Sequence, residues 1–258
     1  MSGVFYNQAA LKPHRSRYWL NRAPEETADE KMAAVTPLSL QAPTLHTAGE
    51  RVLSTDERTG SQALERKQPP IPLGPGRVER REFAYLRPGT MPLIANFEVA
   101  QGDVVAPSLG PTRTEEDCVA HSARTVASAP QATRWPFVPD NLNMPQSESL
   151  VRFVAKHDGI TAALGHKEKH GMLQAMATRA TFLADPTPGI VFHYTPKHAA
   201  WMNQSEMWCS LLVRQLLQRA SFTAVEELQA KVVACITYFK ATMAKPFKWT
   251  YGRQPLSV

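Results

Sequence analysis

The sequence predicts an α/β protein, a mixed sheet flanked by helices, with an irregular segment at its N-terminus. Two apolar runs, at 92–100 and 103–109, flank the turn-like pair Gln101-Gly102, which is typical of an antiparallel hairpin. Later apolar runs alternate with helical patterns, so a layered sheet with mixed strand directions is expected. The 258 residues, 43% hydrophobic and 20% charged, are sufficient for one large globular domain or two small ones.

The N-terminal third is expected to be largely irregular. Residues 1–20 are basic and aromatic without a full helical period, and 21–49 are interpreted as a Pro/Thr-rich linker with a short helical candidate at 25–35. A strand is predicted at 51–55. Residues 61–90 mix proline, glycine and charge, so a long irregular excursion is expected before the hairpin.

The rest of the chain shows clearer periodicity. Helices are expected at 114–129, 147–157, 203–218 and 225–243, and short strands at 134–138 and 190–194. The acids that follow Thr114 favour a helix N-terminus, and Ser147 is a suitable helix cap. The segment 159–189 is interpreted as a basic loop followed by a helix to about Leu183.

Charge and cysteine content restrict the compartment and the partners. The formal charge is +6, and residues 140–258, with 13 basic and 8 acidic groups, carry +5 of it, which allows a polyanionic partner. The chain has three cysteines, which lie far apart in sequence. Their odd number and wide spacing indicate a reducing compartment and argue against a disulfide scaffold or a cysteine zinc site. No apolar run approaches the ~20 residues of a membrane helix, and no secretory leader is recognised, so a cytoplasmic protein is expected.

Three acids are predicted to meet at one edge of the sheet. Asp56 follows the strand at 51–55, Asp140 follows the strand RWPFV by one residue, and Glu206 lies in the first turn of the helix after IVFHY. In α/β sheets the functional crevice lies at strand ends. Converging carboxylates repel one another unless cations lie between them, and oxygen ligands suit Mg²⁺ or Mn²⁺. Two such ions about 3.5–4 Å apart can promote phosphoryl transfer.

Each acid also has an ordinary structural interpretation. Ser54 and Asn203 each stand three residues before a glutamate, which is the spacing of a capping box. Asp140 precedes an asparagine, as in many turns. Composition and spacing alone therefore leave a nucleic-acid-directed α/β domain as one option among several.

Longer motifs around the acids favour the catalytic interpretation. They read STDERTGSQALERK, PDNLNMPQSESL and HYTPKHAAWMNQSEMW, in that order, and ANFEVAQGDVVAP and FKWTY accompany them. Together they resemble the DDE transposases of bacterial insertion sequences in the mariner-like superfamily. The resemblance covers about residues 50–252.

The resemblance implies a ribonuclease-H-like fold and a DNA-cutting enzyme. Asp56, Asp140 and Glu206 would be the catalytic acids and would bind two Mg²⁺ (or Mn²⁺) ions. The family cuts DNA at the inverted-repeat ends of a mobile element and joins the freed 3′ hydroxyl to target DNA. The implied partners are transposon-end DNA and target DNA at the bacterial nucleoid, a homodimer is an open option, and no membrane is involved.

Three features depart from the family pattern. Pro139 replaces the usual aliphatic residue before Asp140, and NMPQ follows Asn141 where a histidine is often found. The interval between Asp140 and Glu206, 206 − 140 = 66 positions, is longer than usual, so 159–189 is interpreted as an insertion. Residues 1–49 would be a remnant of the DNA-reading helix-turn-helix region plus a linker, and 253–258 a short tail.

Several other residues are candidates for DNA contacts. Lys197 and His198 precede the Glu206 helix and could meet phosphate, with a solvated loop as the alternative. Lys167 and Lys169 would make the insertion a DNA-contacting loop. Trp201 is expected in the core with Trp208, Leu211 and Leu212. The basic and aromatic group Lys245, Lys248, Trp249, Tyr251 and Arg253 could stack on DNA, but packing against the core with solvated lysines is favoured.

Three functions follow in order of preference. The first is an active DDE transposase catalytic domain. The second is a truncated or decayed copy that folds and binds DNA but is catalytically inactive, which Pro139 and the incomplete front region motivate. The third is a host nuclease with the same core. Metal-dependent strand cleavage separates the first from the second.

Overall fold

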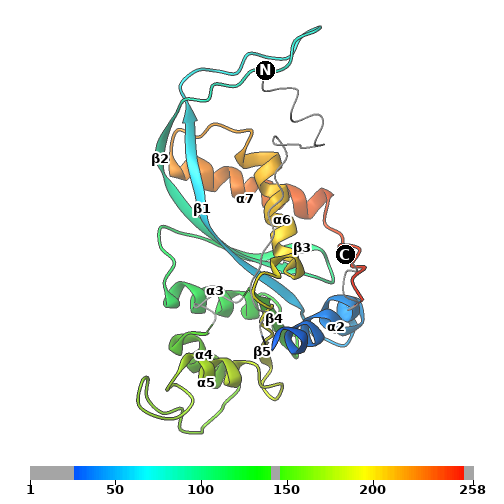
Figure 1. Cartoon of the computed structure of the whole chain (residues 1–258), viewed down its shortest axis with the longest axis vertical. Coiled ribbons are helices and arrows are strands. Elements are labelled where there is room, and N and C mark those ends of the chain that lie inside the picture. The colour runs from blue at the N-terminus through cyan, green and yellow to red at the C-terminus, as the bar shows by residue number, and fades with distance from the viewer. Residues whose placement is uncertain (1–25, 141–145, 253–258) are drawn as a thin grey trace, which may run out of the picture.

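A computed structural model describes residues 26–140 and 146–252, and the expectations for 1–20 and 253–258 lie outside it. Five strands form one mixed sheet in the order β3-β2-β1-β4-β5 (Figure 1). They are β1 (Leu53–Arg66), β2 (Tyr85–Glu98), β3 (Asp103–Leu109), β4 (Trp135–Pro139) and β5 (Ile190–Phe192). β1, β2 and β3 pair antiparallel, while β4 is parallel to both β1 and β5.

Helices cover both faces of this sheet. They are α2 (Ala28–Thr47), α3 (Glu115–Ala127), α4 (Glu148–His157), α5 (Met176–Leu183), α6 (Gln204–Leu212) and α7 (Val225–Thr242). One core lies between β1–β3 and the pair α6 and α7. A second core lies between β1, β4 and β5 and the layer of α3, α4 and α5. The predicted mixed sheet with flanking helices is confirmed.

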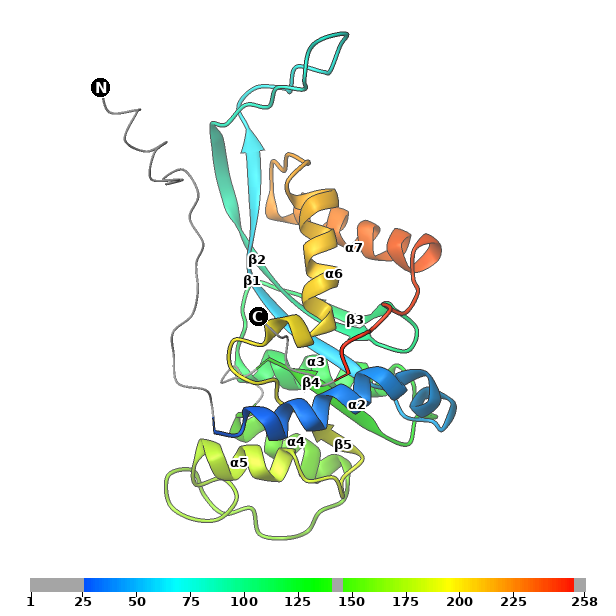
Figure 2. The ribbon, with the colours of Figure 1, turned by 45° about the vertical axis from the view of Figure 1, so that its right-hand side comes forward.

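Strands β1 and β2, which pair as a hairpin, are much longer than the strands predicted at 51–55 and 92–100. Both strands have 14 residues, so the expected irregular excursion at 61–90 is wrong at both ends, and only 67–84 form an irregular connection. Register shifts between Arg58 and Ser61, and again between Ala63 and Glu65, interrupt the alternation that marks a strand in sequence. The outer half of the hairpin projects from the body of the molecule (Figures 1 and 2).

Residues 28–47 form helix α2 where we expected a linker with a short helix at 25–35. Pro37 and Pro43 lie inside it, and each removes a backbone donor, which explains why the sequence argued against a helix. Burial compensates for that loss. Val35 and Ala42 are fully buried, and they pack in clusters that include Val138 of β4 and Val52 just before β1. Tertiary packing therefore holds α2 across one end of the sheet.

Local capping signals predicted the start of two helices correctly. Thr114 accepts a hydrogen bond from the backbone N–H of Asp117, whose carboxylate bonds back to Thr114, so α3 begins with a capping box. Ser147 accepts from the backbone N–H of Leu150 at 3.2 Å and caps α4. No helix in the described part of the chain is long and apolar enough to cross a membrane.

A buried histidine on α3 is expected to make the fold sensitive to acid. His121 is 1% exposed, its Nδ1 lies 2.5 Å from Ser108 Oγ, and burial lowers its pKa to about 3. The unfolded chain takes up a proton at this residue below about pH 6.5, whereas the folded chain does not. The free energy of unfolding should therefore fall as the pH drops from 6.5 toward 3, by about 2 kcal/mol from this residue at pH 5.

Urea unfolding at pH 7.5 and pH 5 measures this effect. The His121→Gln variant should lose about 2 kcal/mol less stability than the wild type between the two pH values. His166→Gln, on an exposed loop, is the control and should behave like the wild type. An identical pH dependence in all three proteins would contradict a buried neutral His121.

Candidate active site

Asp56 lies within β1 and faces the α6 side of the sheet. It was predicted to follow a strand at 51–55, but β1 continues to Arg66, so the capping box proposed for Ser54 is wrong. Asp56 is opposite Ala95 of β2, which belongs to the core beneath α6 and α7. Because side chains alternate along a strand, Asp56 shares that face. Its side chain is buried, with 8% exposed.

Asp140 comes directly after β4, as predicted, and is half-buried. Thr55 pairs with Pro139 in the parallel ladder, so Asp56 and Asp140 each stand one residue beyond a matched pair. Neighbouring strands lie about 4.8 Å apart, which places the two acids side by side at one edge. Pro139 keeps its place in β4, and its carbonyl accepts from Thr195 N–H at 3.2 Å. Residues 141–145, with the predicted turn pair, are outside the described residues.

Glu206 is in the first turn of α6, and Asn203 attaches that turn to β1. Asn203 caps the helix by accepting from the backbone N–H of Ser205. Its Nδ2 donates to the Thr55 carbonyl at 2.7 Å, and its Oδ1 accepts from the Ser54 hydroxyl. Asn203 is fully buried. We call this set of bonds the Asn203 clamp, and it fixes the Glu206 turn beside the strand that carries Asp56.

Cys209 also belongs to this edge, one helical turn after Glu206. The thiol is hydrogen bonded to the Asp56 carboxylate, and burial raises its pKa well above the usual range, so it stays protonated and donates. No sequence pattern predicts this role of Cys209, because the number and spacing of the cysteines indicate only a reducing compartment. For Asn203 the NQSE motif did carry a signal, but it was weighed only as a helix cap.

Asp56 and Glu206 carry like charges and repel each other when both are ionised. Burial raises the pKa of Asp56. Burial, followed by the charge of Asp56, raises the pKa of Glu206, and Arg58 counteracts both shifts in part. A cation between the two carboxylates would remove this repulsion, and their oxygen donors suit Mg²⁺ or Mn²⁺.

Asp56, Asp140 and Glu206 lie along one side of the site, which we call the acidic edge, but their side chains do not converge on one point. Across residues 26–140 and 146–252, no group of three or more His, Cys, Asp or Glu side chains is gathered closely enough to hold a metal ion. Glu206 and Asp56 interact, and Asp140 directly follows the adjacent strand β4. The donor chemistry thus fits the metal that the sequence predicted, while the described conformation shows no metal site.

The predicted DNA-contacting residues fall into two places. Lys197 and His198 are exposed in the connection between β5 and α6, which leads to the Glu206 turn. Lys167 and Lys169 are exposed on a tight loop between α4 and α5, closed by the hydrogen bond from His166 N–H to the His170 carbonyl at 2.9 Å. That loop lies with α4 and α5, at the end of the molecule away from the β1–β2 hairpin (Figures 1 and 2).

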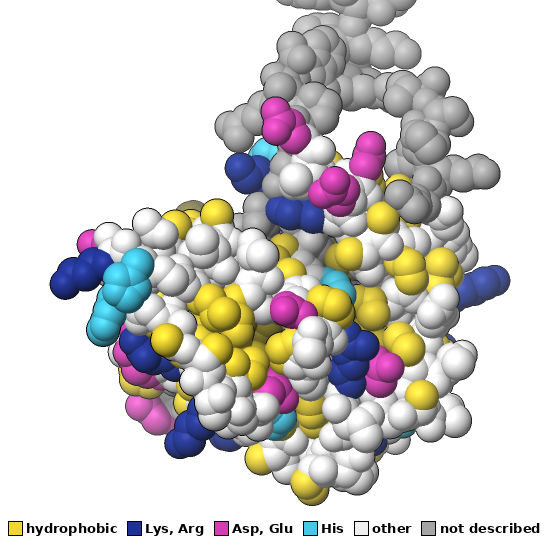
Figure 3. Space-filling model, turned by 90° about the horizontal axis from the view of Figure 1, so that it is seen from below, with side chains coloured by type: hydrophobic (Ala, Val, Ile, Leu, Met, Phe, Trp, Pro, Cys, Tyr) yellow, Lys and Arg dark blue, Asp and Glu magenta, His cyan; other side chains and the backbone are white. Residues whose placement is uncertain are grey.

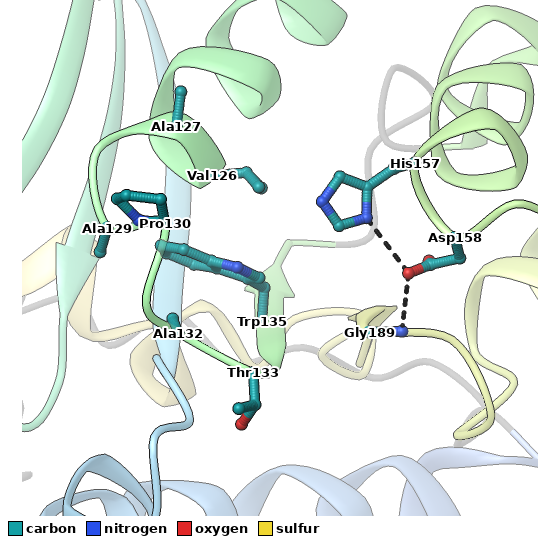
Figure 4. A pocket seen from close by; sticks show the side chains of 10 residues that line it. All are labelled: Val126, Ala127, Ala129, Pro130, Ala132, Thr133, Trp135, His157, Asp158 and Gly189. Carbon is teal, nitrogen blue, oxygen red and sulfur yellow. Dashed lines mark hydrogen bonds and ion pairs between the residues drawn. The ribbon is translucent and has the colours of Figure 1, made fainter.

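A separate cavity lies at the opposite end of β4. It measures about 270 Å³, and Trp135 forms one wall while His157, Asp158 and Gly189 form the other (Figure 4). Asp158 Oδ1 accepts from Gly189 N–H at 3.2 Å and lies 3.1 Å from His157 Nδ1. Seen from below, hydrophobic side chains gather at the centre of the molecule among charges of both signs (Figure 3). Trp135 begins β4 and Asp140 follows its end, so this cavity is not part of the acidic edge.

Comparison with solved structures identifies the fold. The chain is similar to the transposase in a crystal structure of the Mos1 mariner paired end complex with Mn, with a TM-score of 0.54 and 11% identity, over 91% of this chain and 62% of that one. The catalytic domain of Mos1 mariner transposase also matches, with a TM-score of 0.49 and 11% identity, over 85% of each chain. The chain thus spans less than two thirds of the longer transposase, and what they share is a ribonuclease-H-like α/β core.

Sequence comparison identifies the family. No curated protein sequence matches the chain. A family model described as DDE superfamily endonuclease matches residues 51–229, from just before β1 into α7. The matched region includes Asp56, Asp140 and Glu206 and covers more than half of the chain. The chain therefore belongs to the DDE superfamily of endonucleases.

Proposed function

We propose that residues 50–252 form the catalytic domain of a DNA transposase, which cuts DNA at the inverted-repeat ends of a mobile element and transfers the freed strand to target DNA. The observation that carries this proposal is the Asn203 clamp, which holds the Glu206 turn against the strand of Asp56. Family membership supplies the reaction class. The Mos1 transposase, solved as a paired end complex with Mn, supports transposon-end DNA as the substrate and a divalent metal as the cofactor.

Asp56, Asp140 and Glu206 would hold two Mg²⁺ or Mn²⁺ ions. Such ions, when bound, activate a water or a 3′ hydroxyl for attack on phosphorus and stabilise the leaving oxygen. The chain itself supplies position. The Asn203 clamp orients Glu206, and the Cys209 thiol donates to Asp56 and fixes the direction of that carboxylate.

The basic residues would hold the DNA backbone. Lys197 and His198 lie in the segment that leads to Glu206, so they are placed to meet phosphates next to the cut. Lys167 and Lys169 lie on the α4–α5 loop and would contact DNA further from it. Two copies of the chain, each on one transposon end, would make the pairing of ends symmetric.

Strand cleavage in the presence of Mg²⁺ or Mn²⁺ tests this function. The substrate is a duplex with the inverted repeats that flank the coding region. Asp56→Asn and Glu206→Gln should each lower the cleavage rate by at least about 100-fold, because each change keeps the side-chain shape but removes a negative charge that would hold the metal ions.

Glu226→Gln is the matched control, because Glu226 is an exposed glutamate in the first turn of α7, as Glu206 is in the first turn of α6. It should cleave like the wild type. A folded wild-type chain that binds this DNA but does not cut it with either metal would establish the second function, an inactive DNA-binding copy.

A further inference from the structure

Trp201 is an exposed aromatic residue beside the acidic edge. The sequence predicted it in the core with Trp208, seven residues later, but only Trp208 is buried, at 2% exposure. Trp201 is 48% exposed. It lies in the 3₁₀ turn η2 (Ala200–Met202), before α6 begins, so the helical spacing that would put both rings on one face does not apply. Single exposed hydrophobic residues are ordinary on a protein surface, so what distinguishes Trp201 is how its ring is held and where it lies.

Two further aromatic rings hold Trp201 in place. The Trp249 ring stacks nearly parallel to it, with centroids 6.3 Å apart and 10° between the planes, and Tyr251 meets it edge-on at 4.8 Å. Trp249 packs against the buried cluster that includes Val138 and Met202. The Tyr251 hydroxyl lies 3.7 Å from the Met32 sulfur of α2. Trp249 and Tyr251 are therefore anchored to the body of the protein, while about half of Trp201 stays exposed.

Trp201 lies close to the predicted catalytic acids along the chain. Asn203, two residues later, is bonded to Thr55, the neighbour of Asp56. Glu206 is five residues later, so the chain can separate it from Trp201 by at most about 18 Å. That length corresponds to about five nucleotide steps of 3.4 Å along one strand.

The surroundings have the chemistry of a single-strand binding surface. Lys197 and His198 precede η2, and Lys248 adjoins Trp249, and all three are exposed. Basic groups that follow a phosphate backbone, combined with an aromatic face, are the combination with which proteins bind unpaired nucleotides. In a duplex the faces of the bases are covered by stacking, so a fixed exposed ring favours a base that has left the helix.

We propose that Trp201 is a stacking platform for an unpaired nucleobase of the DNA, within about five nucleotides of the cut phosphate. This inference rests on the proposed function in taking DNA as the ligand. It adds that the strand must be locally unpaired next to the acidic edge and that one of its bases is held by its face, independently of sequence.

A double-mutant cycle between protein and DNA tests the platform. The probe is a fluorescently labelled duplex with a five-nucleotide single-stranded extension, and a matched probe carries abasic sites throughout the extension. Binding is measured in metal-free buffer, so the DNA stays intact. Trp201→Ala should bind the base-containing extension about 5- to 150-fold more weakly than the wild type, and the two proteins should bind the abasic probe equally.

Further variants separate stacking from folding. Trp201→Phe keeps an aromatic face and should bind within about threefold of the wild type, whereas Trp201→Leu keeps only apolar volume and should bind like Trp201→Ala. Tyr238→Ala removes another exposed aromatic ring, 63% exposed on α7, and should bind both probes like the wild type. If Trp201→Ala does not fold, the comparison of the Phe and Leu variants still decides.

Two results would overturn the platform. One is equal affinity of the wild type for the two probes, and the other is an equal loss in Trp201→Ala on both. The platform and the proposed function fail separately. Base-dependent binding through Trp201 in a chain that cuts no DNA supports the platform and refutes the transposase. Cleavage without base-dependent binding supports the transposase and refutes the platform.

Discussion

Replacement of Asn203 by alanine is expected to lower DNA cleavage by at least about 100-fold, a larger effect than its loss of stability explains. The variant loses the α6 cap and leaves the Thr55 carbonyl and the Ser54 hydroxyl without this partner. Loss of a cap and of buried hydrogen bonds together should lower the free energy of unfolding by about 2–4 kcal/mol. The first turn of α6 would then move on β1, and Glu206 with it.

Ser147→Ala is the control for the capping effect. Ser147 caps α4 through the Leu150 N–H, and its loss should cost about 1 kcal/mol without reducing cleavage. Asn203→Asp keeps an acceptor for the cap but turns an oxygen toward the Thr55 carbonyl, so it should also lose activity. Single-turnover cleavage and urea unfolding measure the two effects. Equal activities of Asn203→Ala and Ser147→Ala would show that the clamp does not position Glu206.

Replacement of Gly102 by alanine is expected to destabilise the protein by about 2–5 kcal/mol and to detach its C-terminal segment. Gly102 has φ +71°, and a Cβ there would lie 1.9 Å from the backbone oxygen of Lys245. The segment from Lys245 carries Phe247, stacked on Phe97 at 4.9 Å, and then Trp249. Any shift of Lys245 thus weakens the packing of both rings. Urea unfolding, with limited proteolysis of 244–252, measures the change.

Gly76→Ala is the matched control for backbone conformation. Gly76 has φ +68°, but no atom lies within 4 Å of a Cβ built there. Its variant should therefore lose only the roughly 1–2 kcal/mol of a left-handed non-glycine residue. Similar stabilities for the two variants would mean that the approach of Lys245 to Gly102 does not constrain the C-terminal segment.

The sequence predicted best those elements whose signals lie within a few residues. The α3 and α4 starts follow directly from Thr114 and Ser147, whose side chains bond to the next turn. It predicted β1 and α2 poorly, because distant groups stabilise them. The outer part of β1 is charged and bulged, and its partners in β2 lie 19 (Arg66↔Tyr85) to 30 (Ser61↔Met91) residues further along the chain. Helix α2 contains two prolines and depends on the burial of Val35 and Ala42.

The same distinction applies to the candidate site. The motifs predicted Asp56, Asp140 and Glu206 as the acids of the site, and the structure puts these residues on neighbouring elements. What the motifs did not reveal depends on tertiary contact. The thiol of Cys209 meets Asp56, and Trp201 stays exposed because the chain turns before α6 begins.

The hydrogen bond from Asn203 to Thr55 joins residues that are 148 positions apart. This separation determines at which stage of synthesis the site can assemble. At 5–20 residues per second, ribosomes would need about 7–30 s to make the chain between them. The backbone pairing of β1 and β2 uses only residues 53–98 and can begin early, while the core face of the hairpin stays uncovered until α6 and α7 are made. Glu206 joins the hairpin only when α6 docks on β1. A nascent chain that ends before residue 206 can therefore hold Asp56 and Asp140 but lacks Glu206, so under the proposed function it would cut DNA only after α6 has left the ribosome and docked on β1.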